Sequence, residues 1–205
     1  MKRVEPDSKE IKGLAPAGAG LPAAKVFLAR NIMFPLLRRT VSFQKAVDIF
    51  ESQGRIIVSL SEPLSEETLF ERVMVPPLFG LEENSRYYSV AMVLKHLLTV
   101  GEALKNRIPA LSREEVPEKE VHIEDFKPYG DMEEDIVERY SRFIEGFKKS
   151  LVENLADIDS PATYAHPWFG ELDVKGWMVM GMVHQIVHRR QIEAILALFH
   201  KIYMV

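Results

Sequence analysis

The 205-residue sequence contains no cysteine. This absence excludes disulfides, thiolate metal ligands and a cysteine nucleophile. It agrees with a reducing compartment, and we expect a soluble, cytoplasmic protein. The sequence also lacks an uncharged apolar run long enough to span a membrane, and its first residues lack the compact apolar segment of a signal peptide.

An excess of basic residues is missing as well. The 26 lysines and arginines are outnumbered by 30 aspartates and glutamates, which gives a formal net charge of −4. A nucleic-acid-binding domain needs a basic face, and an anionic membrane surface attracts a polybasic segment. We therefore expect neither a nucleic acid nor a membrane as a partner.

The sequence is expected to contain an N-terminal arm and one domain. Residues 1–24 are rich in glycine, alanine and proline, a composition typical of a linker. Residues 25–205 show no internal repeat and no second boundary, and they are numerous enough to form one domain with a full core. Four segments of this domain repeat apolar residues at helical spacing, at about residues 35–62, 84–105, 132–155 and 174–203.

Capping residues support the predicted helix boundaries. Pro35 suits a first turn, and Asp131 and Asp173 can cap the third and fourth helices. Leu172 and Trp177 have the spacing of a hydrophobic staple at the start of the fourth helix. No segment shows sustained strand alternation. The sequence therefore predicts an all-α protein, a four-helix bundle with long connections.

The stretch "VHQIVHRRQ", residues 183–191, carries the strongest functional signal. On a helix, His188 and Gln191 fall within about 40° of His184, on the face that also carries Trp177 and must be buried. Two imidazoles one turn apart can bind a single ion. The alternative is a pair of core histidines, each satisfied by a hydrogen bond, but burying two imidazoles and an amide together favours a metal.

The same stretch excludes two familiar metal sites. "HQIVH" has the spacing of the zinc-protease motif, but Gln185 stands where that motif needs a glutamate base, and the helical wheel places Gln185 on the outward side. A ferritin-like di-iron site needs inward-facing Glu-x-x-His pairs, and the sequence has none.

A third ligand is expected from another helix, because a catalytic zinc-type site has three protein ligands and one open position. His96 lies in the middle of the buried face of the second predicted helix and is the candidate. His122 is expected to be solvated, and His200 to interact with the dipole of the last helix. His166, in the aromatic loop "YAHPWFGEL", is expected either to pack within that loop or to line a pocket.

Two segments resemble the DinB/YfiT-like superfamily. Residues 166–192 resemble its C-terminal signature, a His-Pro-x-Phe-Gly loop followed by a helix ending in His-x-x-x-His-x-x-Gln, and "VLKHLL", residues 93–98, resembles its second helix. The resemblance implies a bundle of up-down-down-up order. It implies a divalent metal ion bound by His96, His184 and His188. Zinc or nickel is expected, and iron is compatible with the same ligands. The resemblance further implies a thiol-dependent S-transferase or a hydrolase that acts on a small molecule, with a low-molecular-weight thiol as a partner.

Several parts of the site stay open at this point. Gln191 is expected either to hold a ligand ring, which we favour, or to face the pocket, whereas Trp177 and His166 are candidates for the pocket wall. No carboxylate lies on the ligand faces of the two helices, so no general base or other catalytic residue is named. The alternative function is a non-catalytic, metal-stabilised bundle that acts as a binding or interaction module, and a third is a metal-free bundle with an apolar pocket. A homodimer is compatible with each.

Overall fold

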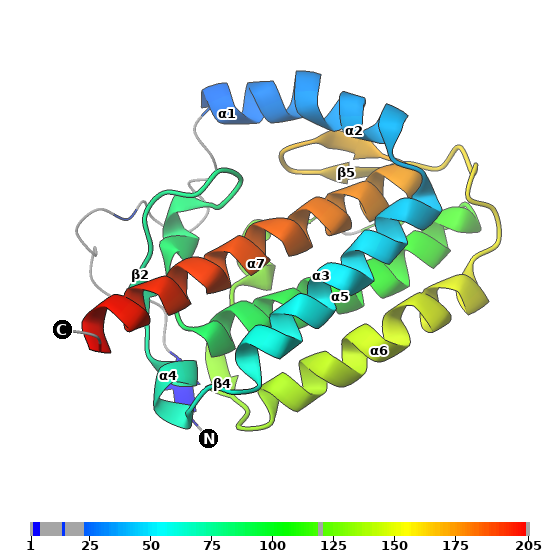
Figure 1. Cartoon of the computed structure of the whole chain (residues 1–205). Coiled ribbons are helices and arrows are strands. Elements are labelled where there is room, and N and C mark those ends of the chain that lie inside the picture. Colours follow the sequence, from blue (N-terminus) through cyan, green and yellow to red (C-terminus); the bar gives the residue numbers. More distant parts are fainter. Residues whose placement is uncertain (1, 5–13, 15–22, 119–120, 204–205) are drawn as a thin grey trace.

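Four long helices lie alongside one another and form the body of the protein (Figure 1). The computed structural model describes residues 2–4, 14, 23–118 and 121–203. The bundle helices are α3 (Phe43–Ser61), α5 (Val90–Ser112), α6 (Ile136–Asn154) and α7 (Val174–Tyr203). The predicted all-α four-helix bundle is therefore confirmed.

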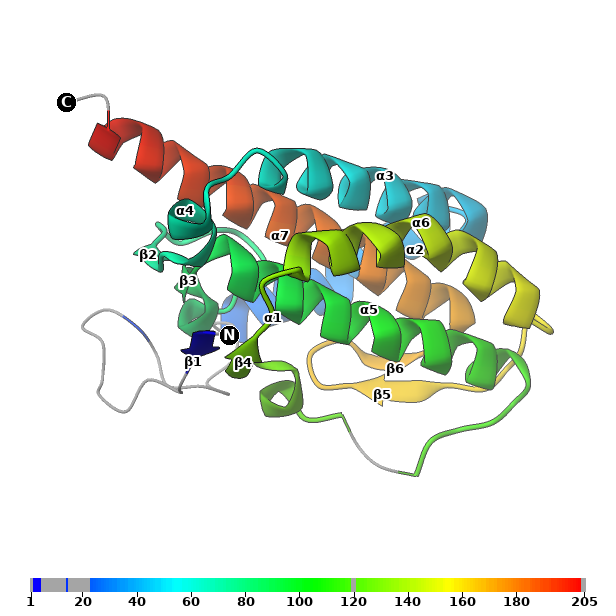
Figure 2. The same cartoon turned by 90° about the horizontal axis from the view of Figure 1, so that it is seen from below.

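The helices follow the expected up-down-down-up order. α5 and α6 run in one direction, and α3 and α7 run in the other (Figures 1 and 2). The parallel pair is tied together at its C-terminal end, where the Asp157 amide donates to the Ser112 carbonyl. α3 packs against α6 through the stacked rings of Phe50 and Phe147, whose centroids are 4.2 Å apart. α7 packs against α3 and α5, so α6 lies diagonally across the bundle from it.

The first predicted helix, residues 35–62, is in fact two helices. α2 (Phe34–Thr40) carries Pro35 in its first turn, as predicted, and ends where Val41 becomes extended. Ser42 then starts α3, because its hydroxyl accepts a hydrogen bond from the Lys45 amide. The break lets α2 leave the direction of the bundle and lie over the hairpin formed by β5 (Tyr164–His166) and β6 (Gly170–Leu172) (Figure 1).

The second helix starts later and ends later than predicted. Residues 84–88 are not α-helical. Glu83–Arg86 forms a 3-10 helix, η2, and Tyr87–Tyr88 forms the short strand β3. Ser89 caps α5 by accepting a hydrogen bond from the Met92 amide. The helix continues to Ser112, past residue 105, because the face that carries Leu104, Ile108 and Leu111 stays fully buried.

Of the two predicted caps of the last two helices, one is wrong and one is confirmed. Asp131 does not cap the third helix: it lies in strand β4 (Gly130–Met132), which pairs with β1 (Lys2–Val4), and α6 begins only at Ile136. Asp173 does cap α7, since its Oδ1 accepts a hydrogen bond from the Gly176 amide at 2.7 Å. Most of the predicted N-terminal arm, residues 1–24, lies outside the described residues.

The connections contain short elements that cover the ends and one side of the bundle. They are α1 (Ala23–Leu28), the π-helical turn η1 (Ala29–Met33), α4 (Glu66–Phe70), β2 (Val73–Met74), η3 (Ile123–Phe126), β5 (Tyr164–His166) and β6 (Gly170–Leu172). β2 pairs with β3 and β5 with β6, both antiparallel. Within the described part of the chain, none of the helices is both long enough and apolar enough to cross a bilayer.

Close approach of α3 and α6 depends on Gly54. A Cβ atom there would lie 2.7 Å from Ile144 Cγ1, whereas a Cβ at Gly146, on the exposed side of α6, would meet nothing within 4 Å. We expect Gly54→Ala to lower the free energy of unfolding by about 1–3 kcal/mol through overpacking. Gly146→Ala should raise it by about 0.5–1 kcal/mol, since alanine favours the helix. Urea unfolding of both variants checks this, and equal effects would contradict it.

Candidate metal centre

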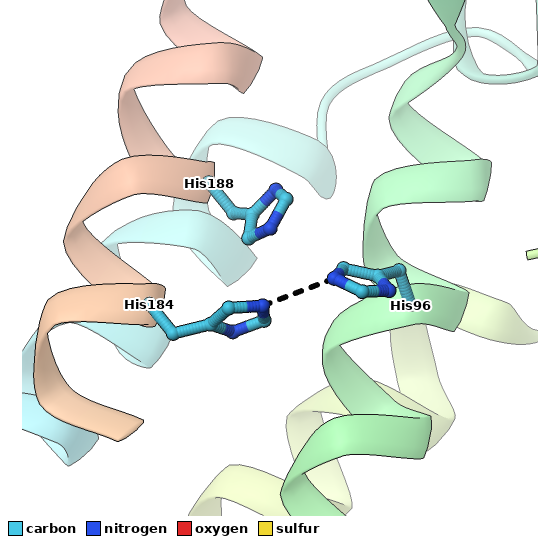
Figure 3. A group of neighbouring side chains, drawn as sticks. All are labelled: His96, His184 and His188. Atoms are coloured by element: carbon cyan, nitrogen blue, oxygen red, sulfur yellow. Dashed lines mark hydrogen bonds between the residues drawn. The ribbon is translucent and has the colours of Figure 1, made fainter. Parts of the chain in front are cut away.

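Three histidine rings meet between α5 and α7 (Figure 3). His96 comes from α5, and His184 and His188 come from successive turns of α7. One ring nitrogen of each lies within 4.8 Å of the others, and His96 Nε2 is 3.0 Å from His184 Nε2. The structure thus brings together the three histidines that the sequence singled out.

Local packing holds the two helices at the distance that this cluster needs. His184 and His188 are one turn apart, so both rings leave the same face of α7. Gly181, almost one turn earlier, allows α5 to pack closely, because a Cβ there would lie 2.7 Å from Leu104 Cδ1. His96 therefore reaches the two α7 rings from the facing helix.

The outer nitrogens of two rings are held by hydrogen bonds. His96 Nδ1 donates to the Phe126 carbonyl at 2.7 Å, and His188 Nδ1 donates to Gln191 Oε1 at 2.7 Å. The orientation of the Gln191 amide follows from its other bond, in which Nε2 donates to the Ser85 carbonyl. With the Nδ1 protons so placed, the Nε2 atoms of His96 and His188 carry lone pairs that face the centre of the cluster.

Burial keeps the rings neutral. It lowers the pKa of His96 to about 4, and it lowers the pKa values of His184 and His188 well below the ordinary value. Neighbouring rings lower the pKa values of His184 and His188 further, and the nearby Lys127 ammonium disfavours a positive charge on His96 and His188. At neutral pH the cluster consequently offers uncharged imidazoles, which is the protonation state that a metal requires.

The cluster fits a divalent cation. Two nitrogen lone pairs at 3.0 Å repel each other unless a proton or a cation lies between them. Neutral imidazoles suit zinc, nickel and iron, and held outer nitrogens are usual for ligating histidines. Among the described residues, His96, His184 and His188 are the grouped side chains that could hold an ion.

A cavity of about 110 Å³ opens beside the three rings. The β5–β6 hairpin and the start of α7 supply His166, Trp168 and Trp177 to its wall. The His166 ring lies 4.9 Å from the Phe169 ring and 5.5 Å from the Trp177 ring, and its Nδ1 accepts a hydrogen bond from the Trp168 amide. Both sequence alternatives for His166 therefore apply together: the ring is packed in the loop and also lines the pocket.

The other histidines lie away from the cavity. His122 is exposed, as expected for a solvated side chain, and His200, near the end of α7, is exposed as well.

Gln185 is placed differently from the prediction. It was expected on the outward side of α7, but it is completely buried, and its Oε1 accepts a hydrogen bond from the Tyr140 hydroxyl at 2.8 Å. The reason is that α7 is covered on more than one side: Gln185 points across the bundle centre toward α6, whereas His184 points toward α5. Gln185 does not line the cavity, so it takes no part in the cluster.

Two charged residues beside the cluster were not found from the sequence. Glu82 and Lys127 line the cavity, have side chains only 5% and 4% exposed, and form an ion pair of 2.5 Å. Glu82 Oε1 is buried and has no hydrogen-bond partner among the described residues. Both residues lie in connections next to η2 and η3, where helical periodicity carries no information about burial. Glu82 is the one carboxylate in the described wall of the cavity.

Comparisons with known proteins leave the site to be interpreted from its own geometry. No protein-family model matches the chain, and no curated protein matches it. One similar solved structure is the crystal structure of TT2238, described as a four-helix bundle protein. It is 19% identical, with a TM-score of 0.49, and the match covers 75% of this chain and 98% of that chain.

Proposed function

We propose that the protein is a divalent-metal-dependent enzyme of the DinB-like type, with His96, His184 and His188 as ligands and zinc or nickel as the ion. The observation that carries this proposal is the convergence of three neutral imidazoles, two of them held at their outer nitrogens, next to a cavity. Three protein ligands and an adjacent cavity are the arrangement of catalytic sites, whereas structural sites usually have four protein ligands.

The reaction we propose is the transfer of a low-molecular-weight thiol to an electrophilic small molecule, or hydrolysis. A divalent ion in the cluster would supply Lewis acidity and favour the deprotonated form of a thiol or a water molecule. The chain would contribute the remaining functions. The aromatic rings of Trp177 and Trp168 exclude bulk water from the cavity, and Glu82 is the carboxylate that can hold the released proton, at Oε1.

A second candidate function is a binding module for a small apolar ligand. It is favoured by a neighbouring cavity of about 190 Å³ beneath the helical segment from α1 to α2, which shares His166 and His184 with the first cavity. Its described wall is made mainly of apolar side chains, such as Met33, Phe34 and Leu37.

The metal site is tested by elemental analysis of full-length protein purified without a nickel column. We expect about one zinc or nickel ion per chain in the wild type. His96→Ala, His184→Ala and His188→Ala should each reduce the metal content at least about tenfold, because each removes one of three ligands. His200→Ala is the matched control: it removes an exposed histidine from the same helix and should leave the metal content unchanged.

The same proteins then decide between the two candidate functions. Zinc- and nickel-loaded wild type is incubated with a panel of thiols and electrophiles, and with ester and amide substrates. Turnover that disappears in the three alanine variants supports the enzyme. Unchanged metal content in all three variants would refute the metal site, and metal-loaded protein without turnover but with an apolar ligand bound would support the binding module.

A further inference from the structure

An arginine lies at the end of the first cavity that is far from the cluster of His96, His184 and His188. Arg107 is on α5, eleven residues after His96, and therefore on the same face of the helix about three turns away. Its guanidinium carbon lies 4.4 Å from the ring centre of Trp177 and 4.8 Å from that of Tyr164. Both Arg107 and Trp177 line the cavity.

This end of the cavity has hydrogen-bond donors without acceptors. Arg107 Nε and Trp177 Nε1 are both buried, and neither has a hydrogen-bond partner among the described residues. Buried N–H groups are almost always paired in native proteins, so two neighbouring orphan donors indicate a missing acceptor. Both groups can only donate, so the group that completes them must carry acceptor lone pairs, as the oxygens of a carboxylate do.

The charge of Arg107 is also uncompensated. The other cation in the described wall, Lys127, is paired with Glu82. Burial lowers the pKa of Arg107, and no carboxylate is among the groups that influence it. A guanidinium nevertheless stays protonated in proteins. The far end of the cavity therefore carries one positive charge, stacked on aromatic rings and without an anionic partner in the described part of the chain.

We propose that Arg107 and Trp177 bind a carboxylate group of the small molecule that occupies this cavity. The single uncompensated charge matches a carboxylate better than a phosphate dianion, and the planar guanidinium matches carboxylate geometry. This inference rests on the proposed function in one respect: it places the reacting group of the same molecule at the histidine cluster. Along the helix axes, Trp177 is about 10 Å from His184 and Arg107 is about 16 Å from His96, so the two groups are separated by about 10–16 Å.

The carboxylate site is tested by calorimetric titration of full-length protein with hexanoate and with 1-hexanol, in parallel with and without added zinc. These probes share an apolar chain and differ at the carboxylate. We expect the wild type to bind hexanoate at least about tenfold more tightly than hexanol. Arg107→Gln should abolish this preference, and Trp177→Phe, which keeps a ring but removes the N–H donor, should weaken hexanoate binding by about three- to tenfold.

A matched control separates the site from general charge effects. Arg55→Gln removes an arginine whose side chain is 65% exposed on α3, and it should keep the full preference. Equal binding of the two probes to the wild type would refute the carboxylate site, as would a preference retained in Arg107→Gln. If circular dichroism shows that Arg107→Gln does not fold, Trp177→Phe tests the same site. An unchanged affinity of Trp177→Phe for hexanoate would refute the carboxylate site.

The test also distinguishes this inference from the proposed metal function. Hexanoate preference should persist in metal-free His188→Ala, because Arg107 is on the other helix and at the other end of the cavity. If the wild type prefers hexanoate to hexanol but holds no metal, the proposed metal enzyme is refuted and the carboxylate site stands. If the wild type holds its metal but binds hexanoate and hexanol equally, the carboxylate site is refuted and the proposed metal enzyme stands.

Discussion

Lys127→Met is expected to lower the free energy of unfolding by about 3–5 kcal/mol. The Lys127 ammonium and the Glu82 carboxylate are both almost completely buried, and each depends on the other for charge compensation. Without the ammonium, the carboxylate stays buried with Oε1 unpaired and loses the partner of Oε2 as well. Urea unfolding followed by circular dichroism near neutral pH measures the loss.

Two further variants make this prediction specific. Glu82→Met combined with Lys127→Met should recover most of the stability, because a buried ion pair replaced as a whole by apolar side chains is often neutral or stabilising. Lys149→Met removes a lysine whose side chain is 79% exposed and should have no measurable effect. A Lys127→Met protein as stable as Lys149→Met would show that the pair is not buried as described.

Metal-free protein is expected to lose stability as the pH falls from about 6.5 toward 4. His96 has a pKa of about 4 in the folded protein and 6.5 when unperturbed. In this window the unfolded chain binds more protons than the folded one, so the free energy of unfolding decreases as the pH falls. The full stability is present above about pH 6.5. His96 alone accounts for about 3 kcal/mol, and His184 and His188 act in the same direction.

Urea unfolding of chelator-treated protein between about pH 7 and pH 5 checks this dependence, because this range lies above the ordinary titration of carboxylates. His96→Gln should reduce the slope of the profile, since glutamine does not titrate, whereas His184 and His188 should keep part of the slope. His200→Gln, which changes an exposed histidine, should leave the slope unchanged. A wild-type profile that is flat over this range would show that the cluster accepts protons without cost in the folded state.

The helices were predictable because their apolar residues repeat at helical spacing along whole faces. Their boundaries were less so. Ser42 and Ser89 each begin a helix by accepting one hydrogen bond from a backbone amide of its first turn. Nothing in the sequence marks these two serines as helix caps rather than as residues inside a longer helix. Asp131 illustrates the opposite error: a good capping residue lies in a strand, because Lys2–Val4, near the start of the chain, pairs with its backbone.

The histidine cluster was predictable for the same reason as the helices, since His184, His188 and Gln191 share one face. Arg107 could have been found in this way, because it follows His96 at eleven residues, close to three full turns. Glu82 and Lys127 could not. They come from separate connections, and only the folded chain shows that these two charges are buried together.

Adjacent residues of α7 face opposite environments, and this restricts how the helix can move. His184 points toward α5, while Gln185 is hydrogen-bonded to Tyr140 across the centre of the bundle. Any rotation of α7 that displaced the rings would break this buried hydrogen bond, and Gln191 is likewise tied to the Ser85 carbonyl. The three histidines are therefore preorganised: the entropy of ordering them belongs to the folding of the bundle and would not weaken the binding of an ion at this cluster.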